Sequence, residues 1–441
     1  MSAQQILIIF PTSYYDEGRL LKQKKATMPN LSILYLAGLV PDRHKVSIVD
    51  ESVSDIDFSF PADLVAVSVI TPNAKRAYEV ADRFRAQGKT VVLGGIHASC
   101  QPEEAAAHAD AVVIGEADIL WPQLIADHEA GRLRKLYQSA EKPELNNLPH
   151  PRFDLVDRTK YIHPPMTSTP IIPIQTSRGC PHACDFCSVT EFWGSRLRFR
   201  PIPEIIEEVK LSGARTVFFT DDNFMANPKR TAELCRALIP LKIKYICQLS
   251  SFAYKHPELV KLLADSGCVI AFVGFESVSR QGLEAVNKGF NKPAEYGRLF
   301  DLLTQHGIHV YASIILGLDG DDEHTVAETV GFLRKQRASI AAFFPLIPTP
   351  GTKLYDRLRE QGRLYADSWW LSDDHTTRRV RIRYGDGAPT GLQLMTKAMR
   401  AFYSPLSILG RYFPYRRNGL LPFVMNLEIA LKLKVTPHYF M

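Results

Sequence analysis

The sequence places three cysteines in one short stretch, R-G-C-P-H-A-C-D-F-C, at residues 178–187. Cys180, Cys184 and Cys187 have the spacing C-x3-C-x2-C, so three thiolates from one loop could ligate three irons of a four-iron cluster. A zinc site that adds His182 is one alternative, although structural zinc is usually held by two separated pairs of ligands. A set of buried, inert cysteines is the other alternative. The spacing favours iron–sulfur chemistry.

Apolar runs alternate with helix-like segments around this stretch. Strands are predicted at 171–177, 216–222, 245–251, 270–276, 310–317 and 340–348. Helices are predicted between them, at 201–212, 228–239, 257–266, 279–288, 294–306 and 322–336. Six consecutive βα units over residues 171–365 predict a TIM-type barrel, complete or a partial (βα)6 form. Chemistry in such barrels lies at the carboxyl ends of the strands.

Residues 1–135 show the same alternation and predict a separate domain. Strands are predicted at 6–10, 45–50, 64–70, 90–95 and 111–116, and helices at 32–40, 74–87, 101–108 and 118–130. The runs are almost continuously apolar, which is typical of strands buried on both faces of a parallel sheet. The prediction is an α/β protein whose N-terminal domain is a doubly wound parallel sheet.

The remaining segments lack this pattern. Residues 136–170 contain six prolines and are predicted to be a linker. Residues 366–441 are predicted to form a mainly helical extension, in which apolar residues and cations such as Arg416, Arg417, Lys432 and Lys434 are interleaved. Such a tail could cap the barrel or contact an anionic membrane surface from the cytoplasmic side.

Composition narrows the class of protein. A net charge of +6 over 441 residues is weak evidence for nucleic acid as a partner. No apolar run reaches the roughly 18–20 residues that a membrane span requires. The cysteines number seven, an odd count, so a reducing cytoplasmic location is favoured over a disulfide-linked secreted fold.

With Phe186 before its last cysteine, the cysteine stretch resembles the signature of the radical SAM superfamily. The resemblance implies a [4Fe-4S] cluster whose open iron chelates S-adenosylmethionine (SAM), and a reductase or flavodoxin-type electron donor. The strand-end motifs T-D-D-N-F (220–224), G-F-E-S (274–277) and I-L-G-L-D-G (315–320) extend it. They imply SAM-binding roles for Asp221, Asp222, Glu276 and Gly317. Each carboxylate could instead form an ion pair at the barrel rim.

Three loops of the N-terminal domain resemble the cobalamin-binding domain of class B radical SAM enzymes: S-V-I-T-P-N (68–73), L-G-G-I-H-A-S (93–99) and I-G-E-A-D (114–118). The residues implied to line the corrin are Ser68, Thr71, Gly94, Gly95, His97, Gly115 and Glu116. The D-x-H-x-x-G motif of cobalamin-ligating mutases is absent, so that motif supplies no histidine to cobalt. An empty scaffold is the alternative.

The resemblance implies a cobalamin-dependent radical SAM enzyme, most simply a C-methyltransferase acting on an unactivated carbon of a small or lipid-like molecule. One alternative keeps both cofactors and forms or rearranges a ring, or oxidises the substrate, without transferring a methyl group. Another is a cobalamin or iron–sulfur sensor without catalysis. The sequence identifies no catalytic side chain beyond those that would hold the cofactors.

Overall fold

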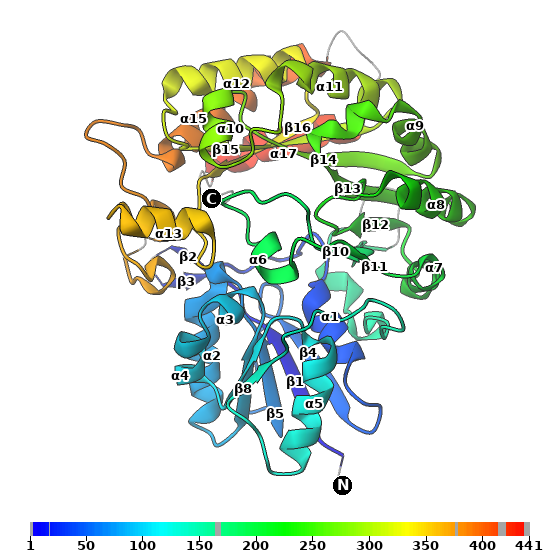
Figure 1. Ribbon diagram of the computed structural model, residues 1–441, viewed down its shortest axis with the longest axis vertical. Helices are drawn as coiled ribbons and strands as arrows, with labels where there is room; N and C mark the ends of the chain where they lie inside the picture. Colours follow the sequence, from blue (N-terminus) through cyan, green and yellow to red (C-terminus); the bar gives the residue numbers. More distant parts are fainter. Residues whose placement is uncertain (1–2, 17, 164–168, 375–377, 413–419, 436–441) are drawn as a thin grey trace.

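The computed structural model describes residues 3–16, 18–163, 169–374, 378–412 and 420–435. Two parallel β-sheets, each covered by helices, lie one above the other along the long axis of the molecule (Figure 1). The first sheet belongs to the N-terminal part of the chain and the second to its middle. The predicted α/β fold class is therefore confirmed.

Six parallel strands form the first sheet, in the order β4-β1-β5-β6-β7-β8. All five predicted strands are present, and the short strand β8 adds one edge. Every residue of the central strand β5 is buried, as expected for a sheet covered on both faces. The strands are β1 (Gln5–Phe10), β4 (Lys45–Asp50), β5 (Leu64–Ser68), β6 (Thr90–Gly94), β7 (Ala111–Ile114) and β8 (Leu136–Gln138).

Helices cover this sheet on both faces. Buried side chains of α1 and α5 pack on one face, and those of α2, α3 and α4 pack on the other. The arrangement is doubly wound, as predicted. The helices are α1 (Leu31–Gly38), α2 (Ala74–Arg85), α3 (Ile96–Cys100), α4 (Pro102–His108) and α5 (Ala117–Glu129), and a small hairpin joins β2 (Tyr14–Asp16) to β3 (Arg19–Leu20).

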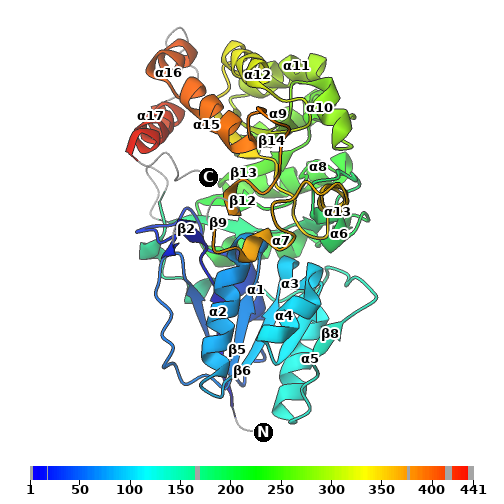
Figure 2. The same cartoon turned by 90° about the vertical axis from the view of Figure 1, so that its left-hand side faces the viewer.

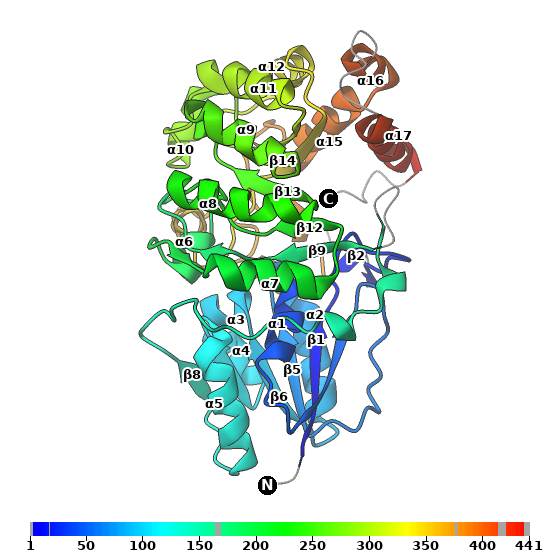
Figure 3. The ribbon, with the colours of Figure 1, turned by 90° about the vertical axis from the view of Figure 1, so that its right-hand side faces the viewer.

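The second sheet contains six parallel strands in the order β16-β15-β14-β13-β12-β9, so it is a barrel that does not close. The strands are β9 (Ile171–Ile174), β12 (Thr216–Phe219), β13 (Lys244–Leu249), β14 (Cys268–Glu276), β15 (His309–Leu316) and β16 (Ile340–Pro345). Helices follow the strands (Figure 3): α7 (Ile202–Ser212), α8 (Pro228–Leu238), α9 (Pro257–Asp265), α10 (Arg280–Ala285), α11 (Tyr296–Gln305) and α12 (Glu323–Lys335). The predicted partial (βα)6 barrel is confirmed.

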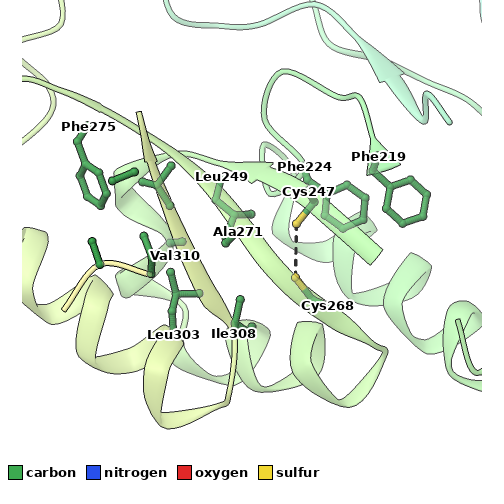
Figure 4. Packing of buried hydrophobic residues seen from close by; sticks show 14 of the residues in the cluster. Phe219, Phe224, Cys247, Leu249, Cys268, Ala271, Phe275, Leu303, Ile308 and Val310 are labelled. Carbon is green, nitrogen blue, oxygen red and sulfur yellow. Dashed lines mark hydrogen bonds between the residues drawn. The ribbon is translucent and has the colours of Figure 1, made fainter. Parts of the chain in front are cut away.

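Three cysteines outside the loop lie in the core of this barrel. Cys247 on β13 and Cys268 on β14 place their sulfur atoms 3.8 Å apart among apolar side chains (Figure 4). Cys235 on α8 is also fully buried. Burial raises the pKa of Cys247 and Cys235, so both thiols stay neutral and pack as small apolar groups.

The described part of residues 136–170, predicted to be a linker, packs against the first sheet and its helix α1. Leu145 is almost completely buried, and the backbone N–H of Arg152 donates to the carbonyl of Leu34 in α1. Strand β8 lies within residues 136–170 and pairs with β7. The domain limits at residues 135, 170 and 365 stay predictions.

The C-terminal region forms helices beside the β16 edge of the barrel (Figure 2). The buried guanidinium of Arg411 donates to the carbonyl of Ala338 and to Oδ1 of Asn426, which fastens this region to the barrel. No helix among the described residues is both long enough and apolar enough to cross a membrane. The helices of this region are α15 (Gly391–Phe402), α16 (Pro405–Tyr412) and α17 (Leu420–Val435). Helix α13 (Lys353–Glu360) precedes them, and its buried side chains pack in the core of the first sheet.

Candidate functional site

The cysteine loop, residues 178–187, lies between the two sheets. It leads from strand β10 (Ser177–Arg178) into the short helix α6 (Val189–Trp193), and strand β11 (Arg198–Phe199) pairs with β10. Gly179 enters the loop with a φ of 95°, and a Cβ placed there would lie 2.3 Å from the carbonyl oxygen of Arg196. Only glycine fits this approach, so the close contact between the start of the loop and Arg196 depends on Gly179.

All three predicted cysteine ligands border one cavity of about 440 Å³ at the carboxyl ends of the barrel strands, which we call the barrel cavity. Burial raises the pKa of all three thiols, that of Cys187 to about 11. Thiolates at these positions therefore require a bound cation.

The cysteines fit a cluster better than a single ion. Within the described ranges, no three His, Cys, Asp or Glu side chains converge closely enough to hold one metal ion. Zinc needs its ligands around a single centre, whereas in an iron–sulfur cube each thiolate ligates a different iron. The donor set of the loop thus matches the cluster that the spacing predicts.

The two neighbouring aspartates after β12 have different surroundings. Asp221 is fully buried and accepts hydrogen bonds from the backbone N–H and hydroxyl of Thr176 and from the hydroxyl of Ser177. It therefore holds the chain just before the cysteine loop and does not border the barrel cavity. Asp222 does border it, and burial, with a smaller contribution from Asp221, raises the pKa of Asp222 to about 7.

Glu276 ends β14 at the wall of the barrel cavity with a φ of 63°, a conformation that non-glycine residues rarely adopt. Its carboxylate accepts a hydrogen bond from Nζ of Lys288 at 2.7 Å. Lys288 also lies 5.6 Å from the ring of Phe186 in the cysteine loop. The sequence analysis missed Lys288, because it follows α10 in a loop without a recognisable motif.

Gly317 is not among the residues that line the barrel cavity. Its φ is 91°, and a Cβ there would lie 2.5 Å from the hydroxyl of Tyr384 and 2.7 Å from Cα of Gly391. The glycine thus allows the C-terminal region to pack against the end of β15. Its proposed contact with SAM stays a prediction.

Aromatic side chains form much of the wall of the barrel cavity. Phe272 stacks on Tyr311 with ring centres 3.9 Å apart, and Phe218 lies 5.6 Å from Phe272. Phe344, which is 45% exposed, borders the same space from β16. This wall suits an apolar ligand with a flat or extended surface.

A second cavity of about 310 Å³ lies at the carboxyl edge of the first sheet, and we call it the first-sheet cavity. Five of the seven residues predicted to line a corrin border it: Ser68, Gly94, Gly95, Gly115 and Glu116. Barrel residues close its other side, including Gln175, Arg178 and Trp193. The cavity therefore lies between the two halves of the molecule.

The other two predicted corrin residues, Thr71 and His97, border neither cavity. His97 is completely buried; its Nδ1 lies 3.2 Å from the hydroxyl of Thr71 and its Nε2 lies 3.1 Å from Oε1 of Glu104. Trp370 donates to the same Glu104. Both imidazole nitrogens are thus engaged in a network that joins α3, α4 and the C-terminal region.

The arginines and tryptophans near the cysteine loop and in the C-terminal region differ in their exposure. Arg178, Arg198 and Arg200 are buried and paired with carboxylates, whereas Arg196 is exposed. Trp369 and Trp370 are core residues, while Trp193 borders the first-sheet cavity. Of these four arginines, only Arg196 is exposed to solvent.

Comparison with known proteins adds independent information. Residues 174–333 match the family model of the radical SAM superfamily, and residues 21–125 match that of the B12 binding domain. The bacteriochlorophyllide d C-8(2)-methyltransferase of Chlorobaculum tepidum is 34% identical over 359 residues, 77% of this chain and 78% of that protein. The hopanoid C-2 methylase of Rhodopseudomonas palustris is 27% identical across 93% of this chain and 79% of its own.

A solved structure shares the fold. The radical S-adenosylmethionine methyltransferase TsrM of Kitasatospora setae, with cobalamin and a [4Fe-4S] cluster bound, gives a TM-score of 0.65 at 16% identity. The match covers 91% of this chain and 85% of that one. The likeness extends over both sheets.

Proposed function

This chain belongs to the cobalamin-dependent radical SAM methyltransferase-like family, and on that premise we propose that it methylates an unactivated carbon of a small, largely apolar ring compound. It is an enzyme with three cofactors: a [4Fe-4S] cluster, SAM and cobalamin. When bound, the cluster supplies the electron that cleaves SAM, and cobalamin supplies the methyl group.

One observation carries the proposal: the two cavities border opposite ends of the same helix. Val189 at the start of α6 lines the barrel cavity, and Trp193 at its end lines the first-sheet cavity. Four residues of helix span about 6 Å. A substrate between the cavities would therefore lie within reach of both, which is the near-attack arrangement that a two-cofactor reaction requires.

The side chains of the barrel cavity divide the remaining tasks. The three cysteines hold the cluster, and the Lys288–Glu276 pair offers a fixed cation and carboxylate to SAM beside it. Asp222 supplies a further carboxyl group on the wall. The aromatic wall excludes water, which protects a radical from side reactions. The apolar lining and the polycyclic compounds named for the relatives support an apolar substrate class.

The test is to count SAM products. The protein is reconstituted anaerobically with iron, sulfide and hydroxocobalamin, reduced, and supplied with SAM and a bacteriochlorophyllide or a hopanoid as the trial substrate. Methyl transfer should produce S-adenosylhomocysteine together with 5′-deoxyadenosine, and the product should gain one methyl group. The Cys184→Ala variant should lose the cluster absorption and all SAM cleavage, whereas Cys100→Ala, outside the loop, should keep both.

Two outcomes would contradict the proposal. 5′-Deoxyadenosine without S-adenosylhomocysteine, with a changed ring in the product, would identify ring formation as the reaction. A protein that binds iron and corrin but never cleaves SAM would be a sensor.

Two finer parts of the proposal concern partners. The enzyme receives its electron from a reductase or a flavodoxin-type protein in the cytoplasm, where the thiols stay reduced. Its C-terminal helices contact the inner face of a membrane when the substrate is lipid-like. Arg416 and Arg417, which contribute to that expectation, lie outside the described residues.

A further inference from the structure

A buried cluster of charges joins the two halves of the molecule next to the cysteine loop. Arg178 on β10 and Arg198 on β11 meet Glu116 and Asp118 at the beginning of α5. None of these four side chains is more than 4% exposed. The two buried positive charges balance the two buried negative charges, and Lys142, which is 41% exposed, adds a further cation 3.9 Å from Glu116 at the edge of the cluster.

Each carboxylate oxygen of Glu116 and Asp118 accepts a hydrogen bond within the cluster. Nη1 of Arg178 lies 2.6 Å from Glu116 and 2.7 Å from Asp118, so one nitrogen bridges both carboxylates. Arg198 contacts both oxygens of Glu116, with its Nη2 at 2.6 Å and its Nη1 at 3.0 Å. The hydroxyl of Tyr35 in α1 donates to the remaining oxygen of Asp118 at 2.6 Å.

The cluster holds both ends of the cysteine loop. Arg178 stands two residues before Cys180 in the chain, and its guanidinium lies 4.8 Å from the ring of Trp193 at the end of α6. Nη2 of Arg198 donates to the carbonyl of Trp193 at 3.1 Å. The beginning of the loop and the helix that follows it are thus both fastened, through these guanidinium groups, to the beginning of α5 in the first domain.

Stability alone does not account for such a cluster. Removing four charges from water costs several kcal/mol per ion, and replacing a buried ion pair by packed apolar residues is often neutral or stabilising. Such a cluster can instead fix the relative position of the two elements that it joins. A planar guanidinium whose hydrogen bonds point at fixed acceptors has few alternative positions. Glu116, Asp118 and Arg178 also line the first-sheet cavity, so the cluster forms part of the wall that the corrin would contact.

We propose that Arg178 is a positioning residue that fixes the separation and orientation of the cobalamin relative to the iron–sulfur cluster. This inference rests on the proposed function, because it requires both cofactors. Arg178 touches no reacting atom in this role. It acts by tying the cysteine loop to the carboxyl edge of the first sheet.

The test measures the distance between the two cofactors and needs no substrate. The protein is reconstituted anaerobically with iron, sulfide and hydroxocobalamin and is reduced until cluster and cobalt each carry an unpaired electron. Pulsed electron paramagnetic resonance then gives the dipolar coupling between them. One variant is Arg178→Lys, which keeps the charge but loses the hydrogen bond that Nε of Arg178 donates to Oε1 of Gln175. The other is the charge-neutral pair Arg178→Gln with Asp118→Asn. The matched control is Arg196→Gln, which removes an exposed partner of Glu144 near the same loop.

The wild type and Arg196→Gln should show one narrow distribution of the distance between cluster and cobalt. Both Arg178 variants should show a broad distribution of that distance. Their iron and corrin contents should stay unchanged. A wild-type distance in either Arg178 variant would overturn the inference. Loss of corrin, or of the folded circular dichroism spectrum in Arg178→Lys, would overturn it as well, since the residue would then serve binding or folding. A wild type that binds no hydroxocobalamin would refute the proposed function first, which separates the two failures.

Discussion

Two adjacent aspartates with the same side chain have different roles in this protein. Asp221 turns inward and satisfies donors of Thr176 and Ser177, each of which would cost about 1–3 kcal/mol if left unmet in the interior. Asp222 borders the barrel cavity beside the cysteines. The sequence motif assigned both to SAM. The surroundings favour Asp222 as the ligand and Asp221 as the support of the loop.

The raised pKa of Asp222 predicts a pH-dependent stability. This carboxyl group should ionise near 3.8 in the unfolded chain and near 7 in the folded, cofactor-free protein. Between these values only the folded state holds the proton, so the free energy of unfolding should fall as the pH rises. Asp222→Asn should weaken this fall, as measured by urea unfolding at about pH 5 and about pH 7.5.

The exposed Asp265→Asn variant is the control for this experiment and should keep the wild-type pH dependence. Superimposable pH profiles for Asp222→Asn and the wild type would show that the carboxyl group is ionised throughout.

At the scale of single elements, the short helix α6 and the C-terminal helices bear most directly on function. Helix α6 separates the two cavities, although its five residues gave no helical pattern in the sequence.

Helices α16 and α17 lie at one side of the barrel (Figure 2) and expose large apolar side chains, such as Leu406 at 84% and Leu431 at 62%. Soluble surfaces seldom group such residues without a partner.

We expect α16 and α17 to contact anionic lipid. In sedimentation with phosphatidylglycerol vesicles, the double variant Leu406→Asp with Leu431→Asp should bind less than the wild type, because charge opposes burial in the lipid interface. Leu211→Asp changes a leucine on α7 that is 58% exposed and should bind like the wild type. Equal binding of all three proteins would contradict a lipid contact through α16 and α17.

At the scale of the whole molecule, the two sheets together enclose the space in which the reaction would take place. The first-sheet cavity is closed by barrel residues, and the linker and C-terminal region pack over both halves. Binding of cobalamin at this boundary should therefore stabilise the complete fold and not only its first domain.

Hydroxocobalamin should raise the melting temperature, because a ligand at about 100 times its Kd adds about 2.7 kcal/mol to the folded state. The Gly94→Val variant should lose this shift. A Cβ at Gly94 meets Val113 only at ordinary contact distance, so the fold tolerates it while the added methyl groups fill the cavity. Differential scanning calorimetry measures the shift.

Gly331→Ala, in the exposed surface of α12, is the control and should respond like the wild type. A full shift in Gly94→Val would place the corrin outside the first-sheet cavity.

The order and type of the main strands and helices followed from the sequence, which also predicted that the cysteine loop ligates an iron–sulfur cluster. Both depend on local information: apolar periodicity sets strand and helix type, and thiolates within eight residues are close neighbours in any fold. Most of the elements that were missed, such as β8, β10, β11, α3 and α6, are two to five residues long and too short to show a period, although the eight-residue helix α13 was missed as well.

The roles of individual polar residues were decided by the tertiary structure. Arg178 and Glu116 are 62 positions apart, and His97 is joined to Trp370 through Glu104 only because the C-terminal region folds back onto α4. Lys288 reaches Glu276 from a loop without a motif. A motif fixes which chemical groups are available, but only packing determines which of them face a cavity and which are neutralised by a distant partner.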